Sequence, residues 1–320
     1  MGARRQDLVE ISDMIVDFDP VTLARNPVRR DEVVRFFRER GQRWAARQVA
    51  SLEVDAHGLL IPAAVDRLLC EAHAEIQLLA EETLQGERVW RVLEPLIEPL
   101  LERQRARREP AGPLRIVDVG CGLGYVTRWL AMHHPLEDVC YVGVDFNPAL
   151  IHAARHIAAR DGITSQCEFA VANAFTMNAP AHLYTSTGVI HHFRGEGLEA
   201  FFKAQYAREE SAGFVHFDIQ PSWLSPIGAW VFHQSRFKVR LGRHDGYFSA
   251  LRAHSSRTLG EAAARTAGPE HAVAMLDSAT GFSPIFRIMH AVVGLRAPIM
   301  THFQGALGTR RFRMCHEPER

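Results

Sequence analysis

The stretch VDVGCGLGYV, Val117 to Val126, places three glycines at alternate positions directly after the apolar run LRIV, Leu114 to Val117. Glycines after a strand permit a tight turn, and they let a ligand approach the backbone without meeting a Cβ atom. The following helical pattern, YVTRWLAMHH, would present its N-terminus to polar or anionic groups. The stretch therefore predicts a strand, a glycine loop and a helix that together form a ligand-binding turn.

The spacing of the glycines argues against a dinucleotide site. A dinucleotide-binding loop needs G-x-G-x-x-G, whereas here the third glycine comes one position early and Tyr125 stands in the required place. The pattern is instead D-x-G-x-G-x-G, with Asp118 at its head. A second acid, Asp145, ends the next predicted strand, where it is placed to accept hydrogen bonds from both hydroxyls of a ribose.

Apolar strands alternate with helical patterns from residue 114 onward. Five strands are expected at residues 114–119, 139–145, 167–171, 182–187 and 213–219, and two more at 272–278 and 286–296. Asn147 is a plausible N-cap and Pro148 a first-turn proline for one of the intervening helices. Strands that alternate with helices imply right-handed crossovers and a parallel sheet, so the predicted fold class is α/β.

Two regions fall outside this alternation. Residues 1–110 show apolar residues at helical spacing and predict a helical N-terminal region that serves as a lid or an oligomerisation element. Residues 221–270 are rich in aromatic and histidine side chains and are too long for an ordinary loop, so we expect a cap inserted after the fifth strand. The ligand-binding domain is expected to comprise residues 111–320, with this insertion.

The composition of the 320-residue chain bounds its partners. The 37 Lys and Arg residues balance 37 Asp and Glu residues, so no global field favours nucleic acid or an anionic membrane. The five cysteines show no CxxC spacing, which disfavours a zinc site and suits a reducing cytoplasm. The N-terminus lacks an apolar signal-peptide core, and no window approaches the roughly 18 apolar residues that span a bilayer. We expect a cytoplasmic protein with a small, weakly charged substrate.

On these motifs the sequence resembles the class I S-adenosylmethionine (SAM)-dependent methyltransferases over roughly residues 112–220. VDVGCGLGYV resembles the family's first motif, whose loop holds the methionine part of SAM. YVGVDFNPALI resembles the second, which implies that Asp145 binds the ribose and Phe146 lies against the adenine. VANAFTMNAP falls where the family usually carries an acid for the adenine amino group, and Asn173 stands there with only a neutral carbonyl oxygen to offer. YTSTGVIHHF resembles the fourth motif, whose strand end lies beside the transferable methyl.

The resemblance implies a Rossmann-like sheet that binds SAM as cofactor. The residues expected at the cofactor are Asp118, Gly120, Gly122, Gly124, Tyr125, Asp145, Phe146, Asn173, Ala174, Phe175, Ser186 and Thr187. Two of these assignments have alternatives, because Asp118 can serve only to tie the turn together and Phe146 can be a core aromatic. Aromatic faces can stabilise a sulfonium charge, and Tyr125 and Tyr184 are the tyrosines nearest to the cofactor loops.

Methyl transfer is an in-line displacement that depends mainly on holding the nucleophile and the methyl in position. A hydroxyl or ammonium acceptor also needs a base, and histidine suits neutral pH. His191 and His192 follow the fourth strand, and Asp218 and Gln220 end the fifth, so these side chains are candidates for catalysis or substrate contact. A histidine at this place can also be structural and pack under the cofactor.

The insertion carries further histidines and aromatic residues. The spacing of His233, His244, Asp245 and His254 fits no metal-ligand template, so we expect surface or cap residues and no metal. The aromatic residues Trp223, Trp230, Phe232 and Tyr247 suit a partly apolar small molecule.

Three functions are compatible with these motifs. The favoured one is a small-molecule methyltransferase, and TSTG in place of an Asn-Pro-Pro-Tyr type motif argues against nucleic acid as acceptor. A second is an enzyme that breaks another C–S bond of SAM, a cyclase or lyase that releases methylthioadenosine, with Tyr184, Ser186 and Thr187 gripping the amine. A third is a non-catalytic SAM-binding protein, with the N-terminal helices as a homodimer interface.

Overall fold

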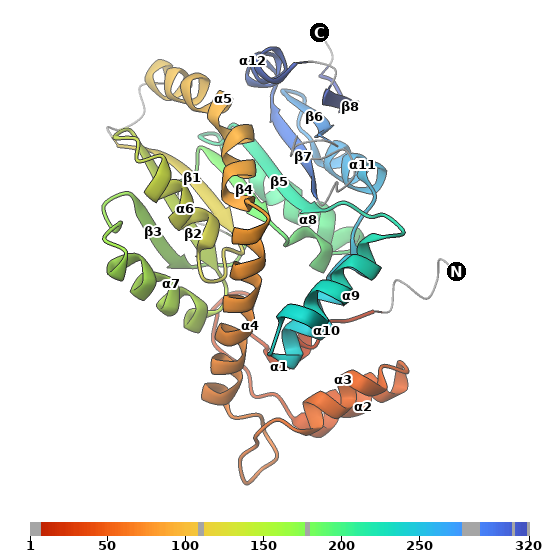
Figure 1. The fold of residues 1–320 in the computed structure, drawn as a ribbon. Helices are drawn as coiled ribbons and strands as arrows, with labels where there is room; N and C mark the ends of the chain where they lie inside the picture. Colours follow the sequence, from red (N-terminus) through yellow and green to blue (C-terminus); the bar gives the residue numbers. More distant parts are fainter. Residues whose placement is uncertain (1–7, 108–111, 177–179, 277–288, 309–310, 319–320) are drawn as a thin grey trace. The chain divides into compact units, whose positions relative to one another are not determined.

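The chain folds into two compact units, each built from two stretches of sequence. The computed structural model describes residues 8–107, 112–176, 180–276, 289–308 and 311–318 (Figure 1). Met1–Leu79 and Pro221–Arg252 form the helical unit, and Ala80–Gln220 and Ala253–Arg320 form the sheet unit.

The sheet unit contains an eight-stranded sheet in the order β3-β2-β1-β4-β5-β7-β6-β8. The strands are β1 (Leu114–Val119), β2 (Val139–Asp145), β3 (Cys167–Val171), β4 (Leu183–Thr187), β5 (Gly213–Ile219), β6 (His271–Leu276), β7 (Met289–Arg296) and β8 (Phe312–His316). The first five are parallel to one another, whereas β7 runs antiparallel to β5 and β6, and β8 runs antiparallel to β6. The order reverses between β1 and β4, and ligands of such sheets bind at the carboxyl ends of the strands at this reversal.

Helices cover both faces of the sheet, which explains why its central strands are apolar almost throughout. One face carries α5 (Gln85–Ala106), α6 (Tyr125–His133), α7 (Pro148–Arg160) and α12 (Ala297–Leu307). The other face carries α8 (Gly195–Tyr206) and α11 (Ser256–Thr266). Every residue of β2 is buried, as expected for a parallel strand that is covered on both sides.

The helical unit has an apolar core of its own. Its helices are α1 (Ser12–Ile15), α2 (Arg30–Glu39), α3 (Arg43–Ala50), most of α4 (Pro62–Glu82), α9 (Ser225–Arg236) and α10 (Arg240–Arg252). The core side chains come from both stretches of sequence, for example Phe37 from α2 and Leu241 from α10. The single amphipathic helix expected around residues 28–53 is two helices, because Gly41 takes a left-handed conformation (φ +72°) between α2 and α3.

The structure confirms the predicted α/β class and seven of the strands, with parts of the last two, residues 277–278 and 286–288, outside the described residues. The expectation of a parallel sheet holds only for β1 to β5. Strand β8 was not predicted, because it is short and its residues alternate between half-buried and exposed positions.

The division into units differs from the predicted boundaries. The predicted N-terminal region ended at residue 110, but α5 packs on the sheet and belongs to the sheet unit. The predicted insertion ended at residue 270, but α11 packs on β6 and likewise belongs to the sheet unit. A segment joins the unit that buries its apolar face, and periodicity alone does not show which unit that is.

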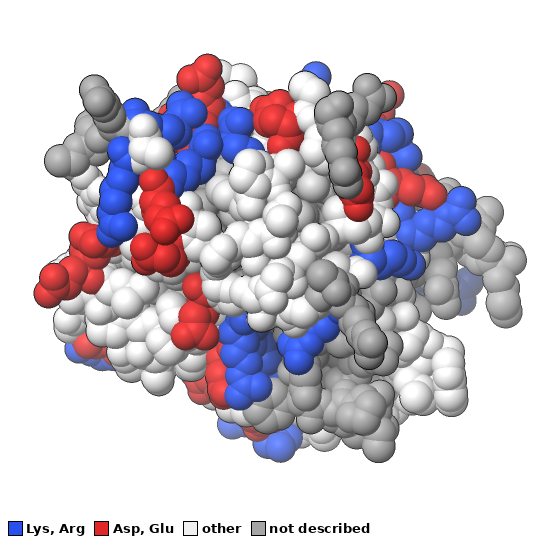
Figure 2. Space-filling view, turned by 90° about the horizontal axis from the view of Figure 1, so that it is seen from above, with Lys and Arg blue, Asp and Glu red and all other residues white. Residues whose placement is uncertain are grey.

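The surface and the helices agree with a balanced composition. On the face shown in Figure 2, Lys and Arg side chains are interspersed with Asp and Glu. Within the part of the chain that the structure describes, no helix combines the length and the hydropathy that a membrane crossing needs.

A test of the packing under the glycine loop uses Gly143 on β2. A Cβ atom there would lie 2.6 Å from the Phe169 ring and 2.9 Å from Cys121 Sγ, both far inside van der Waals contact. We expect Gly143→Ala to lower the free energy of unfolding by about 1–3 kcal/mol, as overpacking of cores does. Gly305→Ala is the matched control, because nothing lies within 4 Å of that site on α12. Urea denaturation that finds Gly143→Ala as stable as the control would contradict this packing.

Candidate functional site

The β1–α6 loop is fixed by backbone hydrogen bonds to the neighbouring strand β2. The amides of Gly120 and Cys121 donate to the Val144 carbonyl oxygen at 2.8 and 3.0 Å. Gly120, Gly122 and Gly124 all take positive φ values (69°, 55° and 72°), which side chains rarely adopt. The loop sequence is therefore a conformational requirement, because each glycine occupies a backbone state that other residues would strain.

Asp145 binds the centre of this loop. Its Oδ2 accepts a hydrogen bond from the Gly122 amide at 3.0 Å, and its Oδ1 accepts one from the Asn147 amide at 2.9 Å. The side chain is buried, so the two amides compensate for the loss of water. A carboxylate offers about four acceptor positions, more than these two amides use. The predicted N-cap is confirmed, since Asn147 Oδ1 accepts from the Ala149 amide at 2.9 Å.

Asp118 ties the loop to the helix that follows it. Its Oδ2 accepts a hydrogen bond from the Thr127 hydroxyl on α6 at 3.0 Å, and the carboxyl is buried. Burial raises the pKa of Asp118 to about 7; the Thr127 bond opposes this shift, and the nearby charge of Asp145 adds to it. The printed contacts of Asp118 match the alternative of a turn-tying residue.

The side chains expected near the adenine include exposed aromatic rings. Phe146 follows β2 and is 46% exposed, so the alternative of a core aromatic is wrong. Phe175 is also exposed on one side, and its ring meets Phe193 edge-on at 5.2 Å. Asn173 uses its carbonyl oxygen to accept the Phe175 amide at 2.9 Å, and Ala174 packs against the core under α8. Phe146 therefore offers the aromatic surface that a purine would need.

The end of β4 departs from the prediction for Tyr184. Side chains alternate along a strand, and Tyr184 points with Ser186 into the core under α8, where both are fully buried. Ser186 Oγ lies 2.9 Å from His216 Nδ1, and burial lowers the pKa of His216 to about 3 despite the charge of Asp218. Tyr184 is thus neither a sulfonium contact nor a grip for an amine, while Thr187 at the strand end is half-buried.

Tyr125, the other tyrosine considered for the sulfonium, begins α6 and is half-buried against α5. Its phenol is hydrogen-bonded to the backbone of Gly86, and burial raises its pKa. The ring therefore helps to fasten α5 to α6.

His191 and Asp218 form a buried pair at the ends of β4 and β5. His191 lies in the 3-10 turn η2 (Ile190–His192), and its Nδ1 is 2.9 Å from Asp218 Oδ1 while its amide donates to Oδ2 at 2.7 Å. Burial opposes the charge of Asp218, but His191, the Ile219 amide and His290 outweigh it, so the pKa of Asp218 falls to about 2. An ionised Asp218 holds the proton of His191 on Nδ1 and leaves Nε2 as the basic atom.

Three further histidines lie in the same sheet unit near this pair. The His192 ring is 4.5 Å from the His191 ring. His290, which the sequence did not single out, pairs with Asp218 across β5 and β7, and its Nδ1 lies 2.9 Å from Ser256 Oγ. The expectation of a surface or cap role for His254 is wrong: it is buried, with Nε2 2.9 Å from the Phe193 carbonyl oxygen, and burial together with Arg194 lowers its pKa to about 4. Antiparallel pairing of β7 with β5 brings His290 here, and no local motif signals that pairing.

The remaining histidines of the predicted cap are buried in the helical unit, so the expectation of surface residues is wrong for them too. The His244 ring is stacked between Trp44 and Phe248, with centroids 5.2 and 4.1 Å away. His233 is stacked on Phe237 at 4.5 Å, and burial lowers its pKa to about 4. These rings belong to the core of the helical unit.

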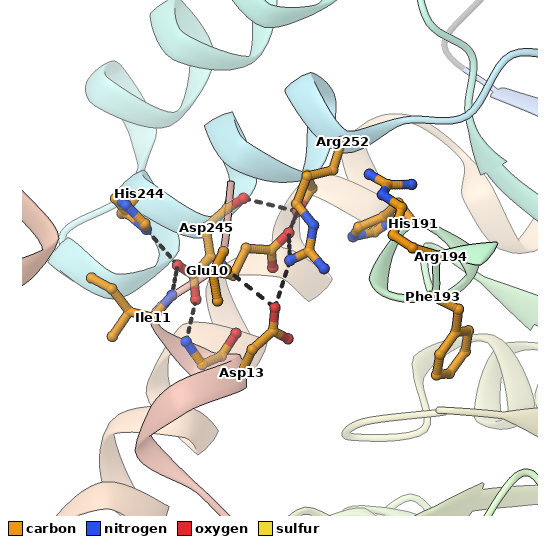
Figure 3. A network of polar contacts seen from close by, with 12 residues as sticks. Glu10, Ile11, Asp13, His191, Phe193, Arg194, His244, Asp245 and Arg252 are labelled. Carbon is orange, nitrogen blue, oxygen red and sulfur yellow. Dashed lines mark hydrogen bonds and ion pairs between the residues drawn. The ribbon is translucent and has the colours of Figure 1, made fainter. Parts of the chain in front are cut away.

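Asp245 belongs to a buried polar network that fastens the N-terminal segment to α10 (Figure 3). Its carboxylate accepts the amides of Ile11 and Ser12 at 2.9 and 3.0 Å, and Oδ1 lies 2.6 Å from His244 Nδ1. In the same network the Arg252 guanidinium pairs with Asp13 at 2.5 Å and with Glu10 at 3.3 Å. Each buried charge thus has a partner of opposite sign or a backbone amide.

With this geometry established, comparisons with known proteins assign the sheet unit. Residues 116–210 match the family model described as a methyltransferase domain. The chain is 29% identical over 143 residues to 23S rRNA (uracil(1939)-C(5))-methyltransferase RlmD of Azoarcus sp. (strain BH72), which is 44% of this chain and 32% of that protein. The chain thus spans about a third of the length of the curated relative that it matches.

Two solved structures are similar over most of their own length. They are the plantazolicin methyltransferase BpumL in complex with SAH, at 12% identity and a TM-score of 0.47 over 72% of this chain and 95% of that one, and a SAM-dependent methyltransferase from Aquifex aeolicus, at 11% identity and a TM-score of 0.41 over 64% of this chain and 93% of that one.

The glycine loop, the strand-end acid and the sheet order define a Rossmann-like nucleoside-binding domain. The match of residues 116–210 places this domain in the class I SAM-dependent methyltransferase family, whose cofactor is SAM.

The raised pKa of Asp118 predicts a pH dependence of stability. Because the folded state holds this proton more tightly than the ordinary value of 3.8 allows, the free energy of unfolding should fall as pH rises from about 4 to about 7 and level off above. The slope from this one group is on the order of 1.4 kcal/mol per pH unit. We expect Asp118→Asn to remove it, so that the variant is stabilised relative to the wild type at pH 8 but not at pH 4.

The measurement is urea unfolding at both pH values, with Asp138→Asn, an exposed position before β2, as the control. An Asp118→Asn effect that is the same at the two pH values would show that Asp118 is ionised throughout and that this assignment fails.

Proposed function

We propose that the protein is a SAM-dependent methyltransferase that acts on a small-molecule acceptor. The observation that carries this proposal is the hydrogen bond from the Gly122 amide to Asp145, which joins a glycine loop to a strand-end carboxylate where the strand order reverses. When bound, SAM supplies an electrophilic methyl on a sulfonium.

The residues at this place suit the parts of SAM. The loop from Gly120 to Gly124 would hold the methionine part, since a Cβ atom at Gly120 would lie 2.7 Å from Val189 and the loop tolerates no larger residue there. Asp145 would accept the ribose hydroxyls through its remaining acceptor positions. The exposed ring of Phe146 would lie against the adenine, with the backbone around Asn173 and Ala174 on the other side.

His191 is the proposed base for an acceptor that carries a hydroxyl or an amine. Asp218 fixes the ring through two hydrogen bonds and stays ionised at neutral pH, because its pKa is about 2. The proton of the acceptor would pass to Nε2 while Nδ1 remains bound to Asp218, and the resulting imidazolium is stabilised by that carboxylate. Methyl transfer to a more acidic acceptor would need no such step.

A small molecule is the favoured acceptor because the composition is balanced and the face in Figure 2 mixes both signs of charge. RNA is the second candidate, favoured by the similarity to the rRNA methyltransferase RlmD over 143 residues. That similarity covers 32% of RlmD, so it bears on the domain that binds SAM rather than on the whole of that protein.

Methyl transfer is also favoured over cyclisation or lysis of SAM. The groups considered for gripping the amine of the substrate included Tyr184 and Ser186, and both are fully buried, with Ser186 bonded to His216. The described residues of β4 thus leave Thr187 alone of the three at a half-buried position.

SAM binding is tested by Asp145→Ala, which removes the proposed acceptor of the ribose hydroxyls. Charged hydrogen bonds of this kind are worth roughly 1.5–3 kcal/mol each, so we expect the Kd for SAM to rise at least about tenfold. Asp138→Ala serves as the control, since it removes an exposed carboxylate from the same unit. Isothermal titration calorimetry in which Asp145→Ala binds SAM as tightly as the control would rule out this site.

The reaction is tested with SAM that carries a labelled methyl group. We expect no methylthioadenosine from SAM alone above the nonenzymatic background. With a cell extract separated into small-molecule and RNA fractions, we expect label to enter the small-molecule fraction, and Asp145→Ala should abolish this transfer. Label in the RNA fraction would favour the second candidate, whereas rapid release of methylthioadenosine that Asp145→Ala abolishes would refute methyl transfer.

A further inference from the structure

Helix α9 of the helical unit presents an apolar face to solvent (Figure 1). Five large apolar side chains recur here at helical spacing, each exposed by half or more: Trp223 (78%), Leu224 (50%), Ile227 (54%), Trp230 (53%) and Val231 (54%). We term these five side chains the α9 face. The other side of the helix packs inward, with His233 stacked on Phe237.

The orientation of α9 reverses the usual arrangement of a surface helix. Such helices normally bury their apolar stripe and expose polar residues, whereas the α9 face contains no charged residue and faces outward. Two exposed tryptophans together with three aliphatic residues exceed the scattered apolar side chains of an ordinary surface. The α9 face is therefore a binding surface for an apolar partner.

The sequence around the α9 face is basic. Residues 219–244 contain no Asp or Glu but four basic residues, whereas the whole chain has equal numbers of both signs. Arg236, Lys238 and Arg240 are exposed and follow the apolar side chains directly. The Glu75 carboxylate on α4 accepts the amide of Lys238 at 2.7 Å, which fixes the backbone of this basic segment.

We propose that the α9 face binds the surface of an anionic lipid bilayer. Amphipathic helices that lie in the interface carry Trp and Leu on one side, and Lys and Arg nearby attract anionic headgroups. Tryptophan in particular favours the headgroup level, because its ring is apolar and its N–H is polar. The apolar stripe would enter the upper part of the bilayer while the basic segment meets the headgroups.

Two other occupants fit the charges and the side chains less well. A second copy of the chain, related by a two-fold axis, would bring two basic segments together. Single-stranded RNA would match the basic residues, but Leu224, Ile227 and Val231 offer no aromatic ring on which bases stack.

The test is co-sedimentation of the full chain with vesicles of phosphatidylcholine alone and of phosphatidylcholine mixed with phosphatidylglycerol. We expect binding to the anionic vesicles, reduced about tenfold or more in the double variant Trp223→Ser, Trp230→Ser. These positions are exposed, so the variant should fold, which circular dichroism checks. Val21→Ser is the control, because Val21 is 85% exposed in the same unit but lies outside the α9 face. Lys238→Gln with Arg240→Gln should remove the preference for anionic lipid.

Depth of insertion gives a second readout. Lipids brominated on the acyl chains should quench part of the wild-type tryptophan fluorescence, and Trp223→Phe with Trp230→Phe should keep binding but lose that quenching. Wild-type protein that ignores anionic vesicles, or Ser variants that bind as well as Val21→Ser, would overturn the proposal. A dimer or an RNA complex that the Ser variants abolish, without vesicle binding by the wild type, would overturn it in favour of those occupants.

Discussion

The hydrogen bond from the Gly122 amide to the Asp145 carboxylate joins the turn after β1 to the end of β2, and the geometry of the site depends on it. Burial makes this contact strong, since neither group has water as an alternative partner. It requires the loop to come close to β2, and that closeness in turn requires Gly143 on β2 and the Phe169 ring beneath it. The same closeness sets two carboxylates, Asp118 and Asp145, near each other, and their repulsion adds to the burial that raises the pKa of Asp118.

The second buried acid, Asp218, acts on the other side of the strand reversal. It is held ionised by His191, by the Ile219 amide and by His290, so its charge is compensated without a contact to solvent. Burial alone would raise the pKa of a carboxylate, as it does for Asp118, and the difference between the two acids lies in their partners. Asp118 receives one hydroxyl, whereas Asp218 faces two imidazoles and two amides. The sheet unit thus contains one acid that favours its proton and one that repels it.

The sequence predicted the parts of the site that are local. The loop conformation, the strand-end acid and the Asn147 cap each depend on neighbouring residues, and each is visible in a stretch of about ten residues. The contact between His191 and Asp218 followed from parallel strands that end at one edge, which needs only the strand assignments. Tyr184 was assigned to the site wrongly because nearness in sequence does not show which side of a strand faces the core. His254 and His290 depend on α11 and on an antiparallel β7, and no local pattern reveals such pairings. The net charge of zero likewise concealed the basic segment around α9, because a sum over the chain says nothing of where the charges lie.

The central claim is that Asp145, held by Gly122, is the acceptor for a ribose at the carboxyl ends of β1 and β2. A crystal structure of the protein with S-adenosylhomocysteine tests it most directly. We predict both ribose hydroxyls within hydrogen-bond distance of the Asp145 carboxylate, with the Gly122 amide still bound to Oδ2 and the adenine against Phe146. Ligand density at another place, or a ribose that makes no contact with Asp145, would contradict this account.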